Sequence, residues 1–234
     1  MEKLATYVVR EGALSSRDAV GWIYRLTVSL APIHGLGVAH GRVSAKGILI
    51  DAPDCSSEAY LLDAGDLVDD PAHYSLPRCQ GGPRCPADDT WAAGVILYRM
   101  LTGQLPFPGV SAAAVADRIN RAPAAPLAVF DVGDDDLQGV LDRLFARDVF
   151  SRLTDLGELG RLLLDWDPSL RGLVALHFGK PGGDDDDDEG SLTQVYQVEE
   201  RQAPKPYRLV QGSRAPWDPP APERAPPPAR ESVD

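Results

Sequence analysis

The residues best suited to chemistry lie on one short loop and just beyond a strand-like run. The stretch GVAHGRVSAKGILID, residues 37–51, places His40 and Arg42 ahead of an apolar run, and Asp63 follows a second such run. From His40 to Gly47 there is no Asp, Glu or Asn. Arginine stays protonated at any working pH, so Arg42 cannot act as a general base. Asp63 could hold a metal ion, but a lone carboxylate binds magnesium weakly without substrate phosphates.

The spacing of histidines and cysteines does not predict a metal site. His34 and His40 are six residues apart, which does not place them on one helix face. Cys79 and Cys85, with His73 nearby, lack the short Cys-x-x-Cys pair of most zinc sites. The odd number of cysteines, three, argues against a disulfide framework. We expect all three to be reduced thiols. We therefore expect no metal and no cofactor.

Charge and hydropathy narrow the class of partner. The 234-residue chain has a net charge of −12, which repels the phosphates of nucleic acids. No apolar run approaches the roughly 18 residues of a membrane span, and the N-terminus MEKLATYVVREGALSSRD lacks a basic-then-apolar signal pattern. These features predict a cytoplasmic protein that binds neither nucleic acid nor membrane, whose partners are one or more proteins. An oligomer is also possible.

Helical spacing of apolar residues dominates the first three quarters of the chain. Residues 15–35 show steps of three and four between apolar side chains, behind a serine cap and ahead of glycines. The same pattern predicts helices over 89–102, 111–120, 134–145 and 156–163, and one that begins at Asp167-Pro168 and includes Phe178. Two short runs, 48–50 and 60–62, predict a hairpin. The expected fold class is mainly α, with about six helices around one short β-hairpin.

The composition changes near residue 179. Residues 179–234 contain 10 of the 21 prolines and the acidic block Asp184–Glu189, and such a segment cannot build a core. We therefore expect a folded domain over 1–178 and an acidic, then proline-rich, disordered tail over 179–234. The tail contains β-forming residues, hydroxyls and a lone tryptophan that are candidates for docking or phosphorylation, although a plain linker explains them equally well. These candidates are Ser191, Thr193, Val195, Tyr196, Val198 and Trp217.

The order of these elements resembles the larger, helical lobe of eukaryotic-type protein kinases, over roughly residues 1–165. The family's motif positions fall, in chain order, on His40-Gly41-Arg42, Ser44, Gly47, Asp63-Ala64-Gly65, Asp89, Trp91, Gly94 and Arg152. Four motifs in the right order make a specific signal. The resemblance implies that His40, Asp89 and Arg152 are structural, and that the first two hold the loop against a buried helix.

Departures from the family pattern lie at the positions that perform its chemistry. The resemblance puts Arg42 where the family has its catalytic aspartate and Gly47 where it has a metal-binding asparagine. No glycine-rich phosphate loop precedes residue 37. The closest match to the family's Ala-Pro-Glu motif is Pro86-Ala87-Asp88. These departures predict a catalytically inactive, single-lobe pseudokinase. It would not be an enzyme, and it would act as a protein-interaction, scaffold or regulatory module.

Two other functions remain open. The chain could be half of a split kinase whose smaller lobe comes from another chain, or a domain that anchors a phosphorylatable tail read by a phosphopeptide-binding or kinase partner. The face that a smaller lobe would cover is the expected interaction surface, covered by a partner, a second copy or residues 195–198. Its predicted members are Leu4, Tyr7, Val8, Ile48, Leu49 and Ile50.

Overall fold

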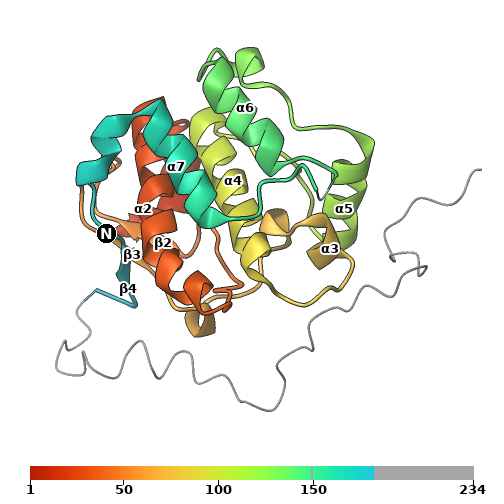
Figure 1. Cartoon of the computed structure of the whole chain (residues 1–234), viewed down its shortest axis with the longest axis horizontal. Helices are drawn as coiled ribbons and strands as arrows, with labels where there is room; N and C mark the ends of the chain where they lie inside the picture. Colours follow the sequence, from red (N-terminus) through yellow and green to blue (C-terminus); the bar gives the residue numbers. More distant parts are fainter. Residues whose placement is uncertain (149, 182–234) are drawn as a thin grey trace, which may run out of the picture. The chain divides into compact units, whose positions relative to one another are not determined.

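The computed structural model describes residues 1–148 and 150–181 (Figure 1). This part of the chain is mainly helical and carries a small sheet, which confirms the predicted fold class. Its helices are α1 (Leu4–Glu11), α2 (Ser16–Gly35), α3 (Leu76–Cys79), α4 (Pro86–Thr102), α5 (Ala112–Arg121), α6 (Asp135–Leu144) and α7 (Leu156–Trp166).

The helix boundaries follow the capping residues that the sequence contains. The side chains of Ser15, Ser111 and Asp134 accept hydrogen bonds from the first turns of α2, α5 and α6. Gly103 ends α4 in the left-handed conformation, with φ of 73°. Helix α4 begins three residues earlier than predicted, because Cys85 and Asp88 form a capping box and Pro86 stands at the first helical position.

Two long helices, α2 and α4, pack against each other and are buried along most of their length. Helix α7 lies against α2, and α6 lies against α4 and α7 (Figure 1). The approach of α7 to α2 depends on Gly160, since a Cβ there would lie 2.9 Å from Thr27 Oγ1. A smaller cluster joins α4 to α5, where Trp91 stacks on Phe107 with ring centroids 5.7 Å apart.

The predicted hairpin is the middle of a four-stranded sheet. Strands β2 (Ile48–Ile50) and β3 (Ala59–Leu61) pair antiparallel, with Leu49 opposite Tyr60. Strand β1 (Glu2–Lys3) adds antiparallel to β2, and β4 (His177–Phe178) adds parallel to β3. The two outer strands are too short for their sequences to predict.

The helix predicted to start at Asp167-Pro168 is wrong beyond its first turn. A 3₁₀ turn over Pro168–Gly172 is followed by extended chain that reaches β4. Two side chains of α2 bind the extended backbone: Arg25 Nε donates to Val174 O at 2.8 Å, and Ser29 Oγ accepts from Leu176 N at 2.7 Å. These bonds use backbone groups that a helix would have paired internally, so tertiary contacts decide the conformation.

Within residues 1–148 and 150–181, no helix combines the length and the apolar character needed to cross a bilayer.

Candidate functional site

The loop that begins at His40 is fixed by Asp89, in the first turn of α4. The Asp89 carboxylate, 1% exposed, accepts hydrogen bonds from the backbone N–H groups of His40 and Gly41, both at 2.8 Å. It also accepts one from Nε2 of His34, at the end of α2, at 2.9 Å. One buried carboxylate therefore joins α2, α4 and the loop, as charged hydrogen-bond acceptors in a dry interior can do.

His40 is buried beneath the loop and bonds the strand side of the site. Its Nε2 donates to Leu62 O at 3.0 Å, and its Nδ1 accepts from Arg42 N at 3.4 Å, which defines a neutral ring protonated at Nε2. Burial lowers the pKa of His40, although the nearby charge of Asp89 opposes that shift. His40 is thus a neutral structural link between the loop and the segment that follows β3.

Arg42 uses its guanidinium to bind the segment after β3. Its Nη1 donates to Ala64 O at 2.6 Å, and its Nε lies 3.2 Å from Asp69 Oδ1. Arg84 Nη2 donates to the same Asp69 oxygen at 2.6 Å, and Arg78 Nη2 lies 4.0 Å from the other one. Partial burial opposes the shift, but Arg84 and Arg42 together lower the pKa of Asp69. The position that resembles a catalytic aspartate is therefore part of an ion-pair cluster.

Two glycines allow the segment after β3 to lie directly on the loop. Gly41 has φ of 74°, and a Cβ there would lie 2.6 Å from Arg84 Cδ. A Cβ at Gly47 would lie 2.8 Å from Leu67 Cδ1. The side chains of Arg84 and Leu67 thus occupy the space above these glycines. Gly47 offers no metal ligand, and it also makes room for Leu67.

Asp63 follows β3 and is half-buried near the end of the described chain. Its backbone carbonyl accepts from Asp66 N at 3.0 Å, where a 3₁₀ turn over Ala64–Asp66 begins. A Cβ at Gly179 would lie 3.9 Å from Asp63 Oδ2, so the segment after β4 passes beside this carboxylate. Asp63 thus lies beside the loop, at the position that the sequence analysis considered for a metal ligand.

Most of the predicted interaction surface is core. Leu4 (0% exposed), Val8 (3%), Ile48 (1%) and Ile50 (1%) are buried, whereas Tyr7 and Leu49 are partly exposed. The expected exposed apolar face is therefore wrong for these four residues. The reason is that β1 and α1 cover β2, with Ala5 N donating to Ala45 O at 2.9 Å.

Arg152 lies after α6, where it closes the loop that precedes α7. Its Nε donates to Ala146 O at 2.7 Å, and its guanidinium stands over the Trp91 ring, 5.3 Å from the ring centroid. Burial lowers the pKa of Arg152, with Asp88 opposing. This contact ties the loop to α4.

Sequence motifs do not mark several residues that organise the site. Asp69, Arg78 and Arg84 meet only because the segment after β3 folds back over the loop. Arg25, 1% exposed, donates to the carbonyls of Cys55 and Ser57 as well as Val174. Its place in the middle of a predicted helix, among apolar residues, was the one available signal.

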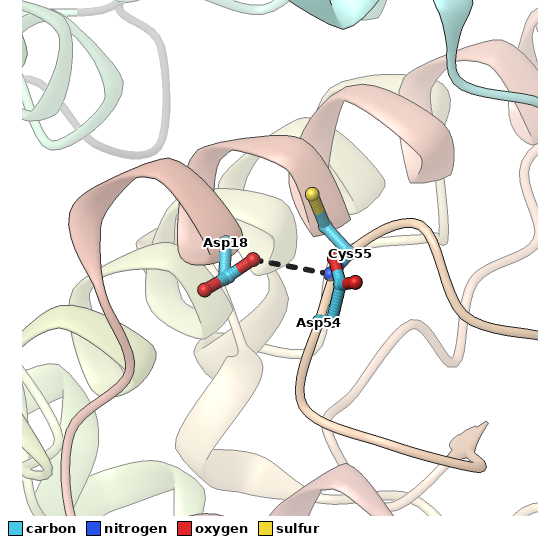
Figure 2. A group of neighbouring side chains, drawn as sticks. All are labelled: Asp18, Asp54 and Cys55. Atoms are coloured by element: carbon cyan, nitrogen blue, oxygen red, sulfur yellow. Dashed lines mark hydrogen bonds between the residues drawn. The ribbon is translucent and has the colours of Figure 1, made fainter.

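Asp18, Asp54 and Cys55 form a group with possible metal-ligand atoms within 4.8 Å of one another (Figure 2). Asp18 accepts from Cys55 N at 3.2 Å and from the Ser15 hydroxyl at 2.5 Å, and Asp54 accepts from Ser56 N at 2.9 Å. Burial, aided by Asp18, raises the pKa of Cys55 to about 11. The hydrogen bond from Cys55 N to Asp18 joins the hairpin loop to α2, so the group serves as an anchor of that loop.

The tail candidates Ser191, Thr193, Val195, Tyr196, Val198 and Trp217 lie outside the described residues.

Comparison with known proteins relates the chain to protein kinases, although no protein-family model matches it. A serine/threonine-protein kinase of Corynebacterium efficiens, named drp72, is 30% identical over 172 residues, which are 68% of this chain and 32% of that protein. The serine/threonine-protein kinase PrkC of Bacillus subtilis is 23% identical, over 48% of this chain and 19% of its own. Calcium-dependent protein kinase 11 of Arabidopsis thaliana is 31% identical, over 43% and 22%.

The fold and the loop geometry, together with these relatives, define the class: the chain is related to the eukaryotic-type serine/threonine protein kinases and contains a region like their helical lobe. It spans between 19% and 32% of the length of these three relatives.

The prediction that the chain is not an enzyme is contradicted by this comparison. The relatives are named serine/threonine or calcium-dependent protein kinases, which points toward a kinase. Arg42 and Gly47 therefore depart from the kinase motifs within a region that is related to kinases. Their structural roles have to be explained within that family.

Proposed function

We propose that this kinase-like region acts as a protein-binding module of a regulatory or scaffold kind, in the cytoplasm. The observation that carries the proposal is the bonding of Arg42. Its guanidinium joins the loop to Ala64 O and to Asp69, so a side chain at the centre of the loop fixes the neighbouring segment in one conformation. Recognition surfaces profit from such preorganisation, because little conformational freedom is lost on binding.

The charge of this surface suits a protein partner with acidic groups. Arg42, Arg78 and Arg84 gather around a single carboxylate in a chain whose net charge is −12. Arginine forks bind carboxylates and phosphates in two-pronged geometry. Because Asp70, Asp88 and Asp89 also line the adjoining pocket, an acidic group of a partner would bind at the three arginines themselves.

A second candidate is one half of a split kinase, whose smaller lobe is supplied by another chain. Asp63 favours it, because this carboxylate stands after β3 beside a loop that Asp89 holds in place. The names of the relatives favour it as well. The second chain would have to supply the lysine and the glycine-rich loop that grip nucleotide phosphates in protein kinases.

Thermal stability and complex formation distinguish the two candidates. A protein-binding module should form a stoichiometric complex with a purified partner on size exclusion, and Arg42→Gln should weaken that complex at least tenfold while Asp63→Asn leaves it unchanged. A split kinase should instead show a rise in melting temperature with MgATP once the second chain is added, and Asp63→Asn should abolish that rise.

Asp117→Asn, on the exposed face of α5, is the matched control for both substitutions. Loss of the complex in Asp117→Asn as well would show general damage. Partner binding that persists at full strength in Arg42→Gln would contradict the module proposal.

A further inference from the structure

The last described residues of the chain form a strap along one edge of the small sheet (Figure 1). The strap is defined here as residues 177–180, which are β4 and the two residues after it. Strand β4 pairs parallel with β3, with Leu61 opposite Phe178, and the pairing ends where Gly179 N donates to Leu61 O at 3.0 Å. The strap therefore covers an edge of β3 that would otherwise present unpaired backbone groups.

The segment ahead of the strap is held by buried hydrogen bonds. Arg25 Nε donates to Val174 O at 2.8 Å, and Leu176 N donates to Ser29 Oγ at 2.7 Å. Arg25 and Leu176 are 1% and 3% exposed. Opening this segment would leave buried polar groups without partners, so it stays closed as long as the domain is folded.

The strap itself is held by fewer and more exposed contacts. His177 is exposed, with its ring centroid 5.0 Å from that of Tyr60, and Phe178 is only partly buried. Lys180 Nζ lies 2.9 Å from Asp66 Oδ1, but these side chains are 64% and 38% exposed, and exposed ion pairs contribute little. Segments with few buried contacts open before the rest of a fold. The strap should therefore lift while the segment ahead of it stays in place.

The closed strap passes beside the carboxylate of Asp63. A Cβ at Gly179 would lie 3.9 Å from Asp63 Oδ2, and Gly179 has φ of 87°, a conformation that favours glycine. Asp63 is partly buried, and within residues 1–148 and 150–181 no hydrogen bond or ion pair engages its carboxylate. The strap thus restricts how a ligand can approach this group.

We propose that the strap is an autoinhibitory device, which alternates between this closed state and an open state in which residues 177–180 have left β3. Lifting frees the edge of β3, including Leu61 O, and opens the approach to Asp63. In the split kinase considered above, the second chain has to reach Asp63, so the closed strap opposes its binding. That consequence rests on this candidate function, whereas the opening itself rests only on the contacts of the strap.

Amide hydrogen exchange, resolved by NMR in the full-length chain, tests whether the strap opens separately. After correction for intrinsic rates, the Gly179 amide should exchange at least tenfold faster than the Leu176 amide. The reason is that the first is bonded within the strap and the second to Ser29 Oγ on α2. Equal rates at the two amides would show that they open together, and would overturn the proposal.

Carboxyl labelling tests the link between the strap and Asp63. Carbodiimide with an excess of glycine ethyl ester modifies accessible carboxylates, and mass spectrometry compares Asp63 with Asp51, which is 64% exposed. Lys180→Gln removes the ion pair with Asp66 and should raise the labelling of Asp63 at least twofold relative to Asp51. Arg121→Gln, which removes an exposed ion pair on α5, is the matched control and should leave that ratio unchanged.

Gly179→Ala opens the strap by a second route, because alanine is strained at φ of 87°. We expect the labelling of Asp63 to rise at least threefold relative to Asp51. Gly172→Ala is its control, since nothing lies within 4 Å of the Cβ position there.

Unchanged labelling of Asp63 in both strap variants, with melting like that of the natural chain, would overturn the proposal. An equal rise in either control variant would do the same, because it would show general loosening of the domain. Neither measurement needs a second chain. Failure to find a nucleotide response would therefore count against the split kinase alone, and failure of these two measurements against the strap alone.

Discussion

At the scale of single residues, the Asp89 carboxylate holds the site together by accepting three hydrogen bonds from the loop and from α2. It is buried and accepts hydrogen bonds from two backbone N–H groups of the loop and from His34. Leaving buried donors without an acceptor costs far more than one hydrogen bond contributes. The loop conformation therefore depends on this one carboxylate.

Asp89→Ala is expected to lower the free energy of unfolding by about 1–3 kcal/mol, because the N–H groups of His40 and Gly41 lose their acceptor. Chemical denaturation followed by circular dichroism measures the change. Asp117→Ala, which removes an exposed ion pair with Arg121, should cost less than about 0.5 kcal/mol. Equal stability of Asp89→Ala and the natural chain would show that the loop is held by other contacts.

Gly41 is the second residue on which the site geometry depends. Gly41→Ala should destabilise the fold by about 1–2 kcal/mol, because φ is 74° and the new methyl group would meet Arg84 Cδ. Gly35→Ala is the matched control, since nothing lies within 4 Å of its Cβ position. Thermal melts of the two variants decide: a difference of less than 1 °C between them would mean that the loop relaxes without strain.

At the scale of elements, Arg25 of α2 holds three separate segments together. Its guanidinium donates to the carbonyls of Cys55 and Ser57 in the hairpin loop and of Val174 ahead of β4. Ser29, one turn further on, binds Leu176. Strand β4 is thereby positioned from α2, and its two residues need little β-propensity of their own.

Arg25→Met keeps much of the buried volume and removes the donors. We expect a loss of stability on the order of 3 kcal/mol, from carbonyls left without partners. Hydrogen exchange should rise first in residues 173–179, where β4 loses its support. Arg17→Met, on the exposed start of α2, provides the comparison. A uniform increase over the whole domain in place of a local one would argue against this positioning role.

The sequence predicts the helices well and the site only in part. Ser15, Ser111, Asp134 and Gly103 are caps with local signals, so the ends of α2, α5, α6 and α4 follow from spacing. Strands β1 and β4 have two residues each, and their pairing comes from tertiary contacts. Burial by β1 and α1 explains why an exposed apolar face was wrongly expected.

The site shows the same division between local and tertiary signals. Asp89 could be assigned to the loop from motif order alone. The pairing of Asp69 with Arg42, Arg78 and Arg84 could not, since 27 residues separate Arg42 from Asp69 and the intervening chain makes a hairpin. Kinase motifs also suggested that Arg42 and Gly47 are losses, whereas the structure gives each a contact of its own.

At the scale of the whole molecule, burial of neutral His40 makes stability depend on pH. Its pKa in the folded chain is below the ordinary value of 6.5, mainly through burial. As pH falls through about 6.5 the unfolded chain binds the proton first, so the contribution of His40 is fully present above that pH and declines below it. Asp70, whose pKa is lowered by His73 despite burial, affects stability only in a more acidic range.

Denaturation at about pH 7.5 and about pH 5.5 tests this dependence. The natural chain should be less stable at the lower pH, and His40→Gln should lose much of that difference even if it is less stable at both. His177→Gln, at an exposed position of β4, should retain it. A pH effect of the same size in His40→Gln and the natural chain would assign it to other groups.

The thiol of Cys55 turns the hairpin loop into a natural reporter of opening. It is fully buried against Gly21 of α2, and its pKa is about 11, so an alkylating reagent meets neither access nor thiolate in the native state. Burial also raises the pKa of Cys79 and of Cys85 to about 11, but Cys85 is exposed and Cys79 partly exposed, so a reagent can reach both without any opening of the fold. Cys55 should therefore be the last of the three thiols to react, and the rate of that slowest reaction measures how often the hairpin loop separates from α2. The unmodified natural chain can thus be followed with a colorimetric thiol reagent, without any introduced label.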